Sequence, residues 1–387
     1  MEHESIFEKQ SRHRRYFYDG FLSGGDDRDV YVRYSAVPKN LPDLTVAIVS
    51  EDEQTGAQMV EQLEEQLPFH INTALNLEQA KAELDNRSIH LIVHIPQNFT
   101  QQLSQQGEQA QLDFFMNDSN PATTSSAMQS VTDQISSKMV AQIQTQSFEG
   151  LLQNMQLPED QAKQMVEGVM TKVAPNMVVT NPKPAGMHNQ MASMFLAMAG
   201  YVGAMIYSMI SVGALQQLKG QLGKWKAFFG LQGLNALLAL IVPLIGLTIY
   251  FSIHGYGAET FIKVWMVHAL ELFTAISFTS IFCMLAGQAG MLLNMPLLLS
   301  QTIAGGAMMP QEMMPGLFKA ISYISPMFYT IQLDYNLLFG GGQTSKYLLG
   351  LALIGAGALL INTLIHQFKG VKTTNEENTP AAQPQFM

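Results

Sequence analysis

Long apolar stretches between residues 191 and 365 constrain this chain of 387 residues more than any other feature. Met191–Leu215 runs for 25 residues without a formal charge, and Ala227–Tyr250 runs for 24. Each exceeds the roughly 20 residues that a helix needs to cross about 30 Å of hydrocarbon. The 178 residues from Met191 to Phe368 contain only ten Asp, Glu, Lys or Arg side chains. The sequence therefore predicts a charged N-terminal half joined to an α-helical polytopic membrane bundle.

Charge and cysteine usage narrow the possible functions. The formal net charge is −10, and the acidic residues cluster before Gln190, so we expect no basic face for nucleic acid. Cys283 is the single cysteine, which excludes an intrachain disulfide. The 25 methionines are expected to fill packed or lipid-facing surfaces, with a methionine metal site as the less favoured interpretation. We expect neither a cofactor nor a metal.

Five spans are expected within a transmembrane domain covering residues 191–368, at about 191–215, 227–250, 262–285, 289–304 and 347–367. Residues 216–226 are expected to form a loop that holds three lysines and no acid, and Lys369 and Lys372 follow the last span. The positive-inside rule makes both places cytoplasmic. Five spans put them an even number of crossings apart, so the two assignments agree. The tail 369–387 is then cytoplasmic, and residues 38–190 are extracellular.

Residues 305–345 are apolar but are interrupted by Pro310, Pro315 and Pro326. Backbone groups that proline leaves unbonded need other partners at membrane depth. We therefore expect one or two short helices that dip into the outer leaflet or lie on it. An ordinary extracellular loop is the alternative.

Strand and helix patterns alternate in residues 38–190, which predicts an α/β domain. Strands are expected at Leu44–Ser50, Ile89–Ile95, Leu112–Met116 and Asn176–Thr180. Helical spacing is found at about 59–67, 76–84, 128–143 and 159–172. Asn76 and Gln79 have the spacing of a capping box. The third helix is long enough to form a helical arm, and Pro182 and Pro184 predict a stiff link to the first span.

Residues 1–37 contain no apolar run long enough to cross a membrane or to act as a signal peptide. Tyr16–Ser35 is a mixture of polar and charged residues. The orientation nevertheless places the α/β domain outside, and a domain of this size rarely crosses without a leading hydrophobic segment. Either the α/β domain is cytoplasmic, or a first span is missing from an atypical polar N-terminus. The resemblance to a known group given below implies the missing span.

His268 and Glu271 are the only ionisable side chains well inside an expected span. Residues three apart share a helix face, so the two are expected to act together. Charges in hydrocarbon usually pair, face the bundle interior or mark a path. The pair is either a gating or substrate-contact site or a structural hydrogen bond between helices.

His90 and His94 point to one face of an expected strand but lack further ligands nearby, so we expect no zinc site. No arrangement of nucleophile and base is evident in the sequence, so we expect a transport or binding protein rather than an enzyme.

Three stretches resemble a known group of proteins. Pro38–Glu53 is similar to the start of the extracellular domain of type-2 ABC transporter permeases. Ile89–Leu103 is similar to the strand, proline and F-S/T-x-x-L element of that domain. The pattern before the family's last span is matched by Pro310, Glu312, Pro315, Pro326 and Tyr329. Over about residues 38–370 the chain most resembles the phage-infection-protein-like (YhgE/Pip-like) membrane proteins.

The resemblance implies a permease subunit that exports an amphiphilic, lipid-like or peptide compound. Such permeases dimerise and use a separate ATP-binding subunit, and this sequence has no G-x-x-x-x-G-K-S/T motif of its own. The residues implied in coupling to that subunit are Lys219, Lys224, Trp225 and Lys226. The alternative for these residues is that they set the topology and anchor the chain to the headgroups of membrane lipids, which are expected partners. The proline-rich segment is implied as the outer gate. An ATP-independent surface receptor or secretion-complex scaffold is the alternative function.

Overall fold

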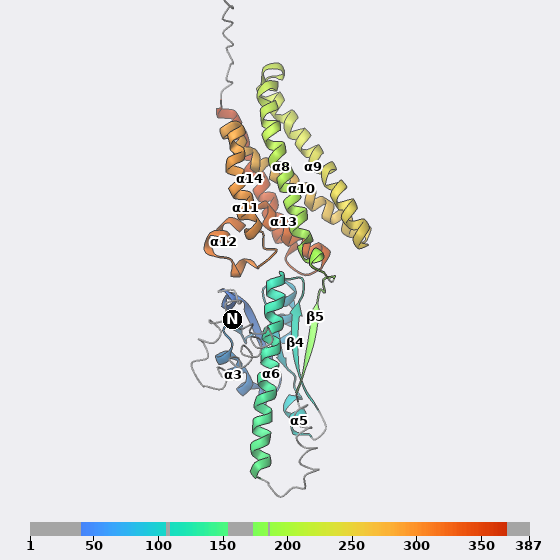
Figure 1. Cartoon of the computed structure of the whole chain (residues 1–387), viewed down its shortest axis with the longest axis vertical. Coiled ribbons are helices and arrows are strands. Elements are labelled where there is room, and N and C mark those ends of the chain that lie inside the picture. Colours follow the sequence, from blue (N-terminus) through green and yellow to red (C-terminus); the bar gives the residue numbers. More distant parts are fainter. Residues whose placement is uncertain (1–39, 106–108, 154–172, 185, 370–387) are drawn as a thin grey trace, which may run out of the picture. The chain divides into compact units, whose positions relative to one another are not determined.

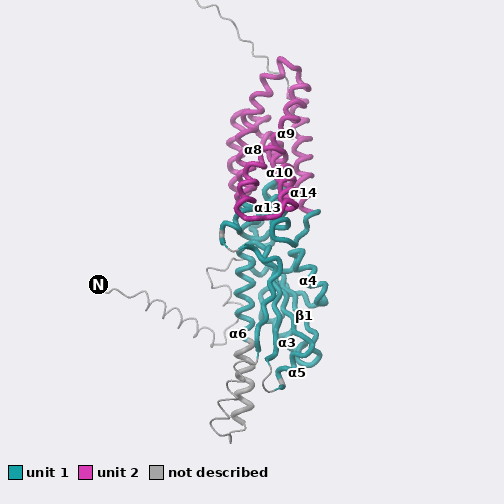
Figure 2. Tube along the Cα trace, turned by 90° about the vertical axis from the view of Figure 1, so that its right-hand side faces the viewer, with its two compact units in different colours: residues 1–194, 303–345 teal, residues 195–302, 346–387 magenta. Residues whose placement is uncertain are grey.

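The computed structural model describes residues 40–105, 109–153, 173–184 and 186–369. The chain divides into two compact units (Figure 2). Unit 1 combines residues 1–194 with residues 303–345, and unit 2 combines residues 195–302 with residues 346–387. The expected polar N-terminus (1–37) and the expected helix at 159–172 lie outside the described residues.

Unit 1 contains a five-stranded mixed sheet in the order β2-β1-β3-β4-β5. Figure 1 labels β4 and β5 beside α6. Its strands are β1 (Thr45–Ser50), β2 (His70–Asn72), β3 (Leu91–Ile95), β4 (Ala110–Asn117) and β5 (Val173–Thr180). β1 pairs in parallel with β2 and β3, with Ile48 opposite Val93, and β5 is parallel to β4. β4 runs antiparallel to β3. The four predicted strands are confirmed, and β2 was missed because its three residues bury no side chain fully.

The described helices of the α/β domain are α3 (Gly56–Gln66), α4 (Leu77–Asp85), α5 (Phe99–Ser104) and α6 (Ala122–Gln153), and the 3-10 turn η1 (Leu41–Asp43) precedes the sheet. The predicted capping box at α4 is confirmed. The Gln79 amide donates to Asn76 Oδ1 at 2.8 Å, and the Asn76 amide donates to Gln79 Oε1 at 3.3 Å. The long helix is confirmed as α6, whose 32 residues extend about 48 Å.

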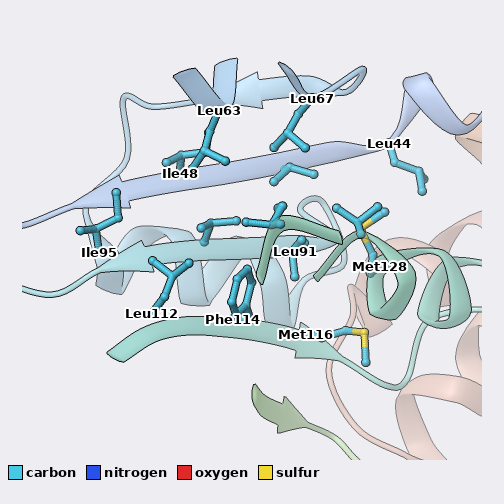
Figure 3. Packing of buried hydrophobic residues seen from close by; sticks show 14 of the residues in the cluster. Leu44, Ile48, Leu63, Leu67, Leu91, Ile95, Leu112, Phe114, Met116 and Met128 are labelled. Atoms are coloured by element: carbon cyan, nitrogen blue, oxygen red, sulfur yellow. The ribbon is translucent and has the colours of Figure 1, made fainter. Parts of the chain in front are cut away.

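Apolar side chains cover both faces of the sheet. Successive side chains of a strand point to opposite faces. Val46 and Ile48 therefore join the large cluster that includes residues of α3 and α6 (Figure 3). Ala47 and Val49 join a second cluster with residues of α4. The near-continuous apolar sequence of β1 is typical of a strand in a sheet that is covered on both faces.

Unit 1 also contains residues 305–345, which we call the outer segment after their predicted placement. The outer segment contains η3 (Gln311–Met313), α12 (Gly316–Ser322) and α13 (Pro326–Leu338). Short helices are present as predicted, whereas their placement at the outer leaflet stays a prediction. Each interrupting proline stands at the start of one of these elements. Proline is favoured there because the first helical turn has no intrahelical partner for its N–H groups.

Unit 2 is helical. Its helices are α8 (Met187–Leu222), α9 (Lys224–His254), α10 (Ala258–Ala286), α11 (Gly290–Ala304) and α14 (Thr344–Phe368), of which α8 and α14 begin just inside unit 1. The described residues contain four stretches long and apolar enough to cross a membrane. They are Met191–Leu222, Lys224–His254, Ala258–Ala304 and Thr344–Phe368. The prediction of five spans is not confirmed, because α10 and α11 form one of these stretches.

α11 folds back against α10 after the short turn η2 (Gly287–Ala289). A side chain at Gly290 would collide with the backbone of Phe282 and Cys283 in α10. Asn294 Nδ2 also donates to Thr279 O at 3.1 Å. The 15 residues of α11 extend about 22 Å, which is short of the hydrocarbon thickness.

The stretch 216–226, expected to be a loop, is helical except at Gly223. Lysine and glutamine are good helix formers, so polarity alone does not end a helix. Gly223 interrupts it with a φ of 83°, a conformation that favours glycine. The first two membrane helices are therefore longer than predicted and joined by a single residue.

Candidate functional site

The structure brings His268 and Glu271 together inside unit 2. Nδ1 of His268 lies 2.7 Å from Oε2 of Glu271, one turn further along α10. The two residues are 4% and 1% exposed. At this distance an imidazole and a carboxylate can share a proton, which lowers the cost of burying either group.

Gly200 of α8 packs directly against this pair. A Cβ atom at Gly200 would lie 3.1 Å from both carboxylate oxygens of Glu271. Small residues let the backbones of membrane helices approach closely. Sequence reasoning missed Gly200 because its role depends on which helix lies opposite, and nothing in the local pattern reveals that.

Buried polar groups continue along α10 beyond the pair and bind three neighbouring helices. Ser208 Oγ of α8 lies 2.8 Å from Thr279 Oγ1, and Asn362 Nδ2 of α14 donates to Ser277 O at 2.6 Å. α11 contributes the amide of Asn294 described above. We call this set the polar stripe of α10; its members on that helix are His268, Glu271, Thr274, Ser277, Thr279 and Ser280.

The predicted coupling residues lie at the junction of α8 and α9, and most of them bind within unit 2. Lys219 is buried and donates to Gln216 Oε1 at 3.2 Å. Lys224 Nζ donates to Gln367 O at 2.8 Å, and the Trp225 ring meets His366 edge-on at 5.2 Å. Trp225 is 40% exposed, and Lys226 is exposed.

The outer segment is hydrogen-bonded to the α/β domain within unit 1. The Arg87 guanidinium donates to Gln332 Oε1 at 3.3 Å and also to Asn336 Oδ1. The Gly342 amide donates to Asp85 O at 2.7 Å. Arg87 has a φ of 62° just after α4, a left-handed conformation at a position where helices often end this way.

Other contacts extend this junction. Thr123 Oγ1 donates to Met308 O at 2.5 Å, and the Lys183 ammonium lies 5.2 Å from the centre of the Tyr335 ring. Burial lowers the pKa of Lys183 to about 8, against the opposing effect of Asp118. A junction of this kind needs partners far apart in the sequence, so local patterns did not predict it.

The predicted gate residues occupy separate places in the outer segment. Pro310 and Pro315 immediately precede η3 and α12, and Pro326 is the first residue of α13. The Tyr329 hydroxyl donates to Tyr323 O at 3.1 Å. Burial lowers the pKa of His90, and the carboxylate of Glu312 partly opposes that effect. Glu312 is thereby linked to a titratable group of the α/β domain.

His90 and His94 do not form a common site. His90 Nδ1 accepts from the Thr45 amide at 3.3 Å, whereas His94 Nδ1 lies 2.9 Å from Asp113 Oδ2. Across the described ranges, no group of three or more His, Cys, Asp or Glu residues is placed to hold a metal ion.

The four candidate spans define a multi-pass membrane protein. A family described as ABC-2 family transporter protein matches residues 30–364. The match covers most of the chain, so the chain belongs to this family. Membership implies transport rather than catalysis, and such permeases generally work with a separate ATP-binding subunit. No curated protein and no solved structure matches the chain.

Proposed function

We propose that this chain is the permease subunit of an exporter that moves an amphiphilic, lipid-like or peptide compound outward with energy from a separate ATPase. The observation that carries the proposal is the family match, which includes both the α/β domain and the helical bundle. The polar stripe of α10 supports it, because polar side chains in membrane bundles face the interior or mark a substrate path. Within this function the chain most resembles the phage-infection-protein-like permeases.

His268 and Glu271 are proposed as the gating pair. Sharing a proton lets Glu271 change its charge without leaving an isolated carboxylate in an apolar surrounding. Gly200 holds α8 against the carboxylate, so a displacement of α8 along α10 changes the environment of Glu271. Movement of the bundle and protonation of the pair are then linked.

The outer segment is proposed as the gate through which cargo leaves. Its prolines fix where η3, α12 and α13 begin, and Glu312 lies in η3 and Tyr329 in α13. Because Arg87 binds α13 within unit 1, the gate and the α/β domain are expected to move together.

We propose that the α/β domain is extracellular and the C-terminus cytoplasmic, with five crossings. Lys224 at the start of α9 binds the end of α14, and Lys369 after α14 binds Met284 O at the end of α10. These helix ends therefore share one membrane face, rich in lysine and hence cytoplasmic. α11 starts at this face, whereas α14 starts at the other. A short fifth crossing by α11 would connect the two.

The ATP-binding subunit is proposed to dock at this lysine-rich face of a permease homodimer or heterodimer. Trp225 and Lys226 are exposed there, whereas Lys219 and Lys224 are engaged within unit 2. Trp225 and Lys226 are therefore the expected contacts with the ATP-binding subunit, and Lys219 and Lys224 support them.

Co-expression with an ATP-binding subunit encoded beside this chain tests the function. We expect the two to co-purify and to hydrolyse ATP in nanodiscs only when both are present. Lys226→Glu should lower that hydrolysis, whereas Lys346→Gln, near the start of α14 and also exposed, should not. Ligand binding by the α/β domain with no associated ATPase would instead favour a receptor or scaffold.

A further inference from the structure

Three lysines from three helix ends come together in unit 2. Lys219 lies in the last turns of α8, Lys224 begins α9, and Lys369 follows α14. Lys219 is within electrostatic reach of the other two ammonium groups, although only 5% of its surface is exposed. A buried ammonium beside two like charges is unfavourable unless an anion compensates them.

The hydrogen bonds of these lysines all go to uncharged acceptors. Lys219 donates to a side-chain amide, and Lys224 donates to the Gln367 carbonyl. Lys369 donates to two carbonyls at the end of α10, at 2.5 and 2.9 Å. An ammonium has three N–H donors, so each lysine has at least one more than its contacts in the described part of the chain use.

Unit 2 supplies no nearby carboxylate among its described residues, which contain only Glu259 and Glu271. Glu259 is bonded to a lysine one turn away, and it lies about 38 Å along α10 from Met284, which Lys369 contacts. Glu271 is bonded to histidine about 20 Å from the same end of the helix. His366, which faces the cluster from α14, adds no negative charge.

Exposed apolar side chains lie on the same helix ends. They are Leu218 and Leu222 on α8, Trp225 and Phe229 on α9, and Phe368 on α14. The N-terminus of α9, at Gly223, has no side-chain cap. Its N–H groups add to the attraction for an anion beside Lys224. A positive centre bordered by apolar side chains matches a molecule with an anionic head and an apolar tail.

We propose that Lys219, Lys224 and Lys369 bind the phosphate of an anionic phospholipid headgroup. The phosphate oxygens would accept the remaining N–H donors in charge-assisted hydrogen bonds. The acyl chains would lie against the exposed apolar side chains. Such a lipid would hold the ends of α8, α9, α10 and α14 together, whether or not the chain exports a substrate.

Native mass spectrometry of the full-length protein tests this site, with phosphatidylglycerol and phosphatidylcholine offered at equal concentration. We expect selective retention of phosphatidylglycerol and a roughly tenfold weaker retention in Lys219→Gln, the loss typical of one charge-assisted hydrogen bond. Lys219 is chosen for substitution because it donates to a side chain, Gln216, whereas Lys224 and Lys369 donate to backbone carbonyls at helix ends. Lys219→Arg should retain the lipid, and Lys346→Gln should leave retention unchanged.

Four results would overturn the proposal. Equal retention of the two lipids, or unchanged retention in both Lys219→Gln and Lys369→Gln, would remove the charge-based site. Displacement of the lipid by millimolar inorganic phosphate would assign the site to free phosphate instead. If phosphatidylglycerol is retained only after residues 370–387 are removed, the tail, which carries Glu376 and Glu377, would be the occupant of the lysine site.

Discussion

The sheet of unit 1 and helix α10 of unit 2 differ in the side chains that they bury. The sheet of unit 1 encloses apolar groups such as Ile48 and Phe114, which are 1% and 0% exposed. α10 of unit 2 buries hydroxyl and ionisable groups as well as apolar ones, whereas Ile245 of α9 and Leu292 of α11 are 69% and 74% exposed. Removal of apolar surface from water stabilises the first unit. Lipid is as apolar as leucine, so close packing and hydrogen bonds must stabilise the second.

The largest expected effect is a cavity in the sheet of unit 1. Phe114→Ala should destabilise this unit by about 4 kcal/mol, because a fully buried ring is lost and the cavity collapses only partly. Hydrogen exchange of the β3 and β4 amides in the full-length protein measures this loss of stability. Ile245→Ala, which removes a large side chain from the exposed face of α9, is the matched control and should leave protection of α9 nearly unchanged. Equal effects would contradict the contrast between the two units.

The next effect concerns close packing in the bundle. Gly200→Ala should cost about 2 kcal/mol, because the new methyl group would press against both oxygens of Glu271. Gly203→Ala is the control on the same helix, since a Cβ at Gly203 would meet nothing within 4 Å. Thermal unfolding in detergent compares the two variants. A Gly200→Ala variant as stable as Gly203→Ala would show that α8 does not rest on the carboxylate.

Sequence reasoning succeeded where the signal was local. The capping box at Asn76 and Gln79 and the spacing of His268 and Glu271 involve residues within one turn of a helix. The prolines of the outer segment likewise predicted its short helices. Each of these features depends on backbone geometry that three or four neighbouring residues determine.

The rest depends on contacts between distant residues. Arg87 binds Asn336 across 249 positions, so no local pattern connects the α/β domain with α13. The polar stripe of α10 needs Gly200, Ser208 and Asn362 from other helices. A loop at residues 216–226 was predicted from their polarity. These residues are good helix formers, however, and α8 continues through them until Gly223. Such features follow from the packing partner, which a single sequence does not identify.

A smaller effect concerns Asp52, a buried polar group of unit 1. Burial raises the pKa of Asp52, but hydrogen bonds from Thr100, Thr55 and Gln54 outweigh this and lower it to about 2. Asp52→Asn should therefore destabilise the ends of α3 and α5 by about 1.5 kcal/mol at neutral pH.

The sign of the pH dependence follows from that shift. Because the pKa of Asp52 is lower in the folded state, its stabilisation is present above about pH 3.8, the unshifted value, and is lost as the pH falls toward 2. Hydrogen exchange of residues 51–66 between pH 3 and pH 7 should show the difference between wild type and Asp52→Asn narrowing at low pH. A constant difference would mean that the carboxylate charge is not responsible.

The smallest expected effect on stability, and the sharpest on function, is at Glu271. Glu271→Gln keeps the shape and a hydrogen-bonding group beside His268 but cannot titrate, whereas Glu271→Leu removes both properties. A purely structural hydrogen bond predicts wild-type behaviour for the Gln variant and a loss of about 1 kcal/mol for the Leu variant. A gating pair predicts that the Gln variant inserts and unfolds normally but loses transport.

Thermal unfolding in detergent and ATP-dependent transport in vesicles, measured on the same preparations with the ATP-binding subunit, separate these outcomes for Glu271. His268→Gln provides the second member of a double-mutant cycle. If the pair acts as one unit, the double variant should lose no more transport than Glu271→Gln alone. Full transport by a well-inserted Glu271→Gln protein would reduce the pair to a structural hydrogen bond. The buried polar stripe would then stabilise the bundle, as the apolar core stabilises the α/β domain, without marking the path of a substrate.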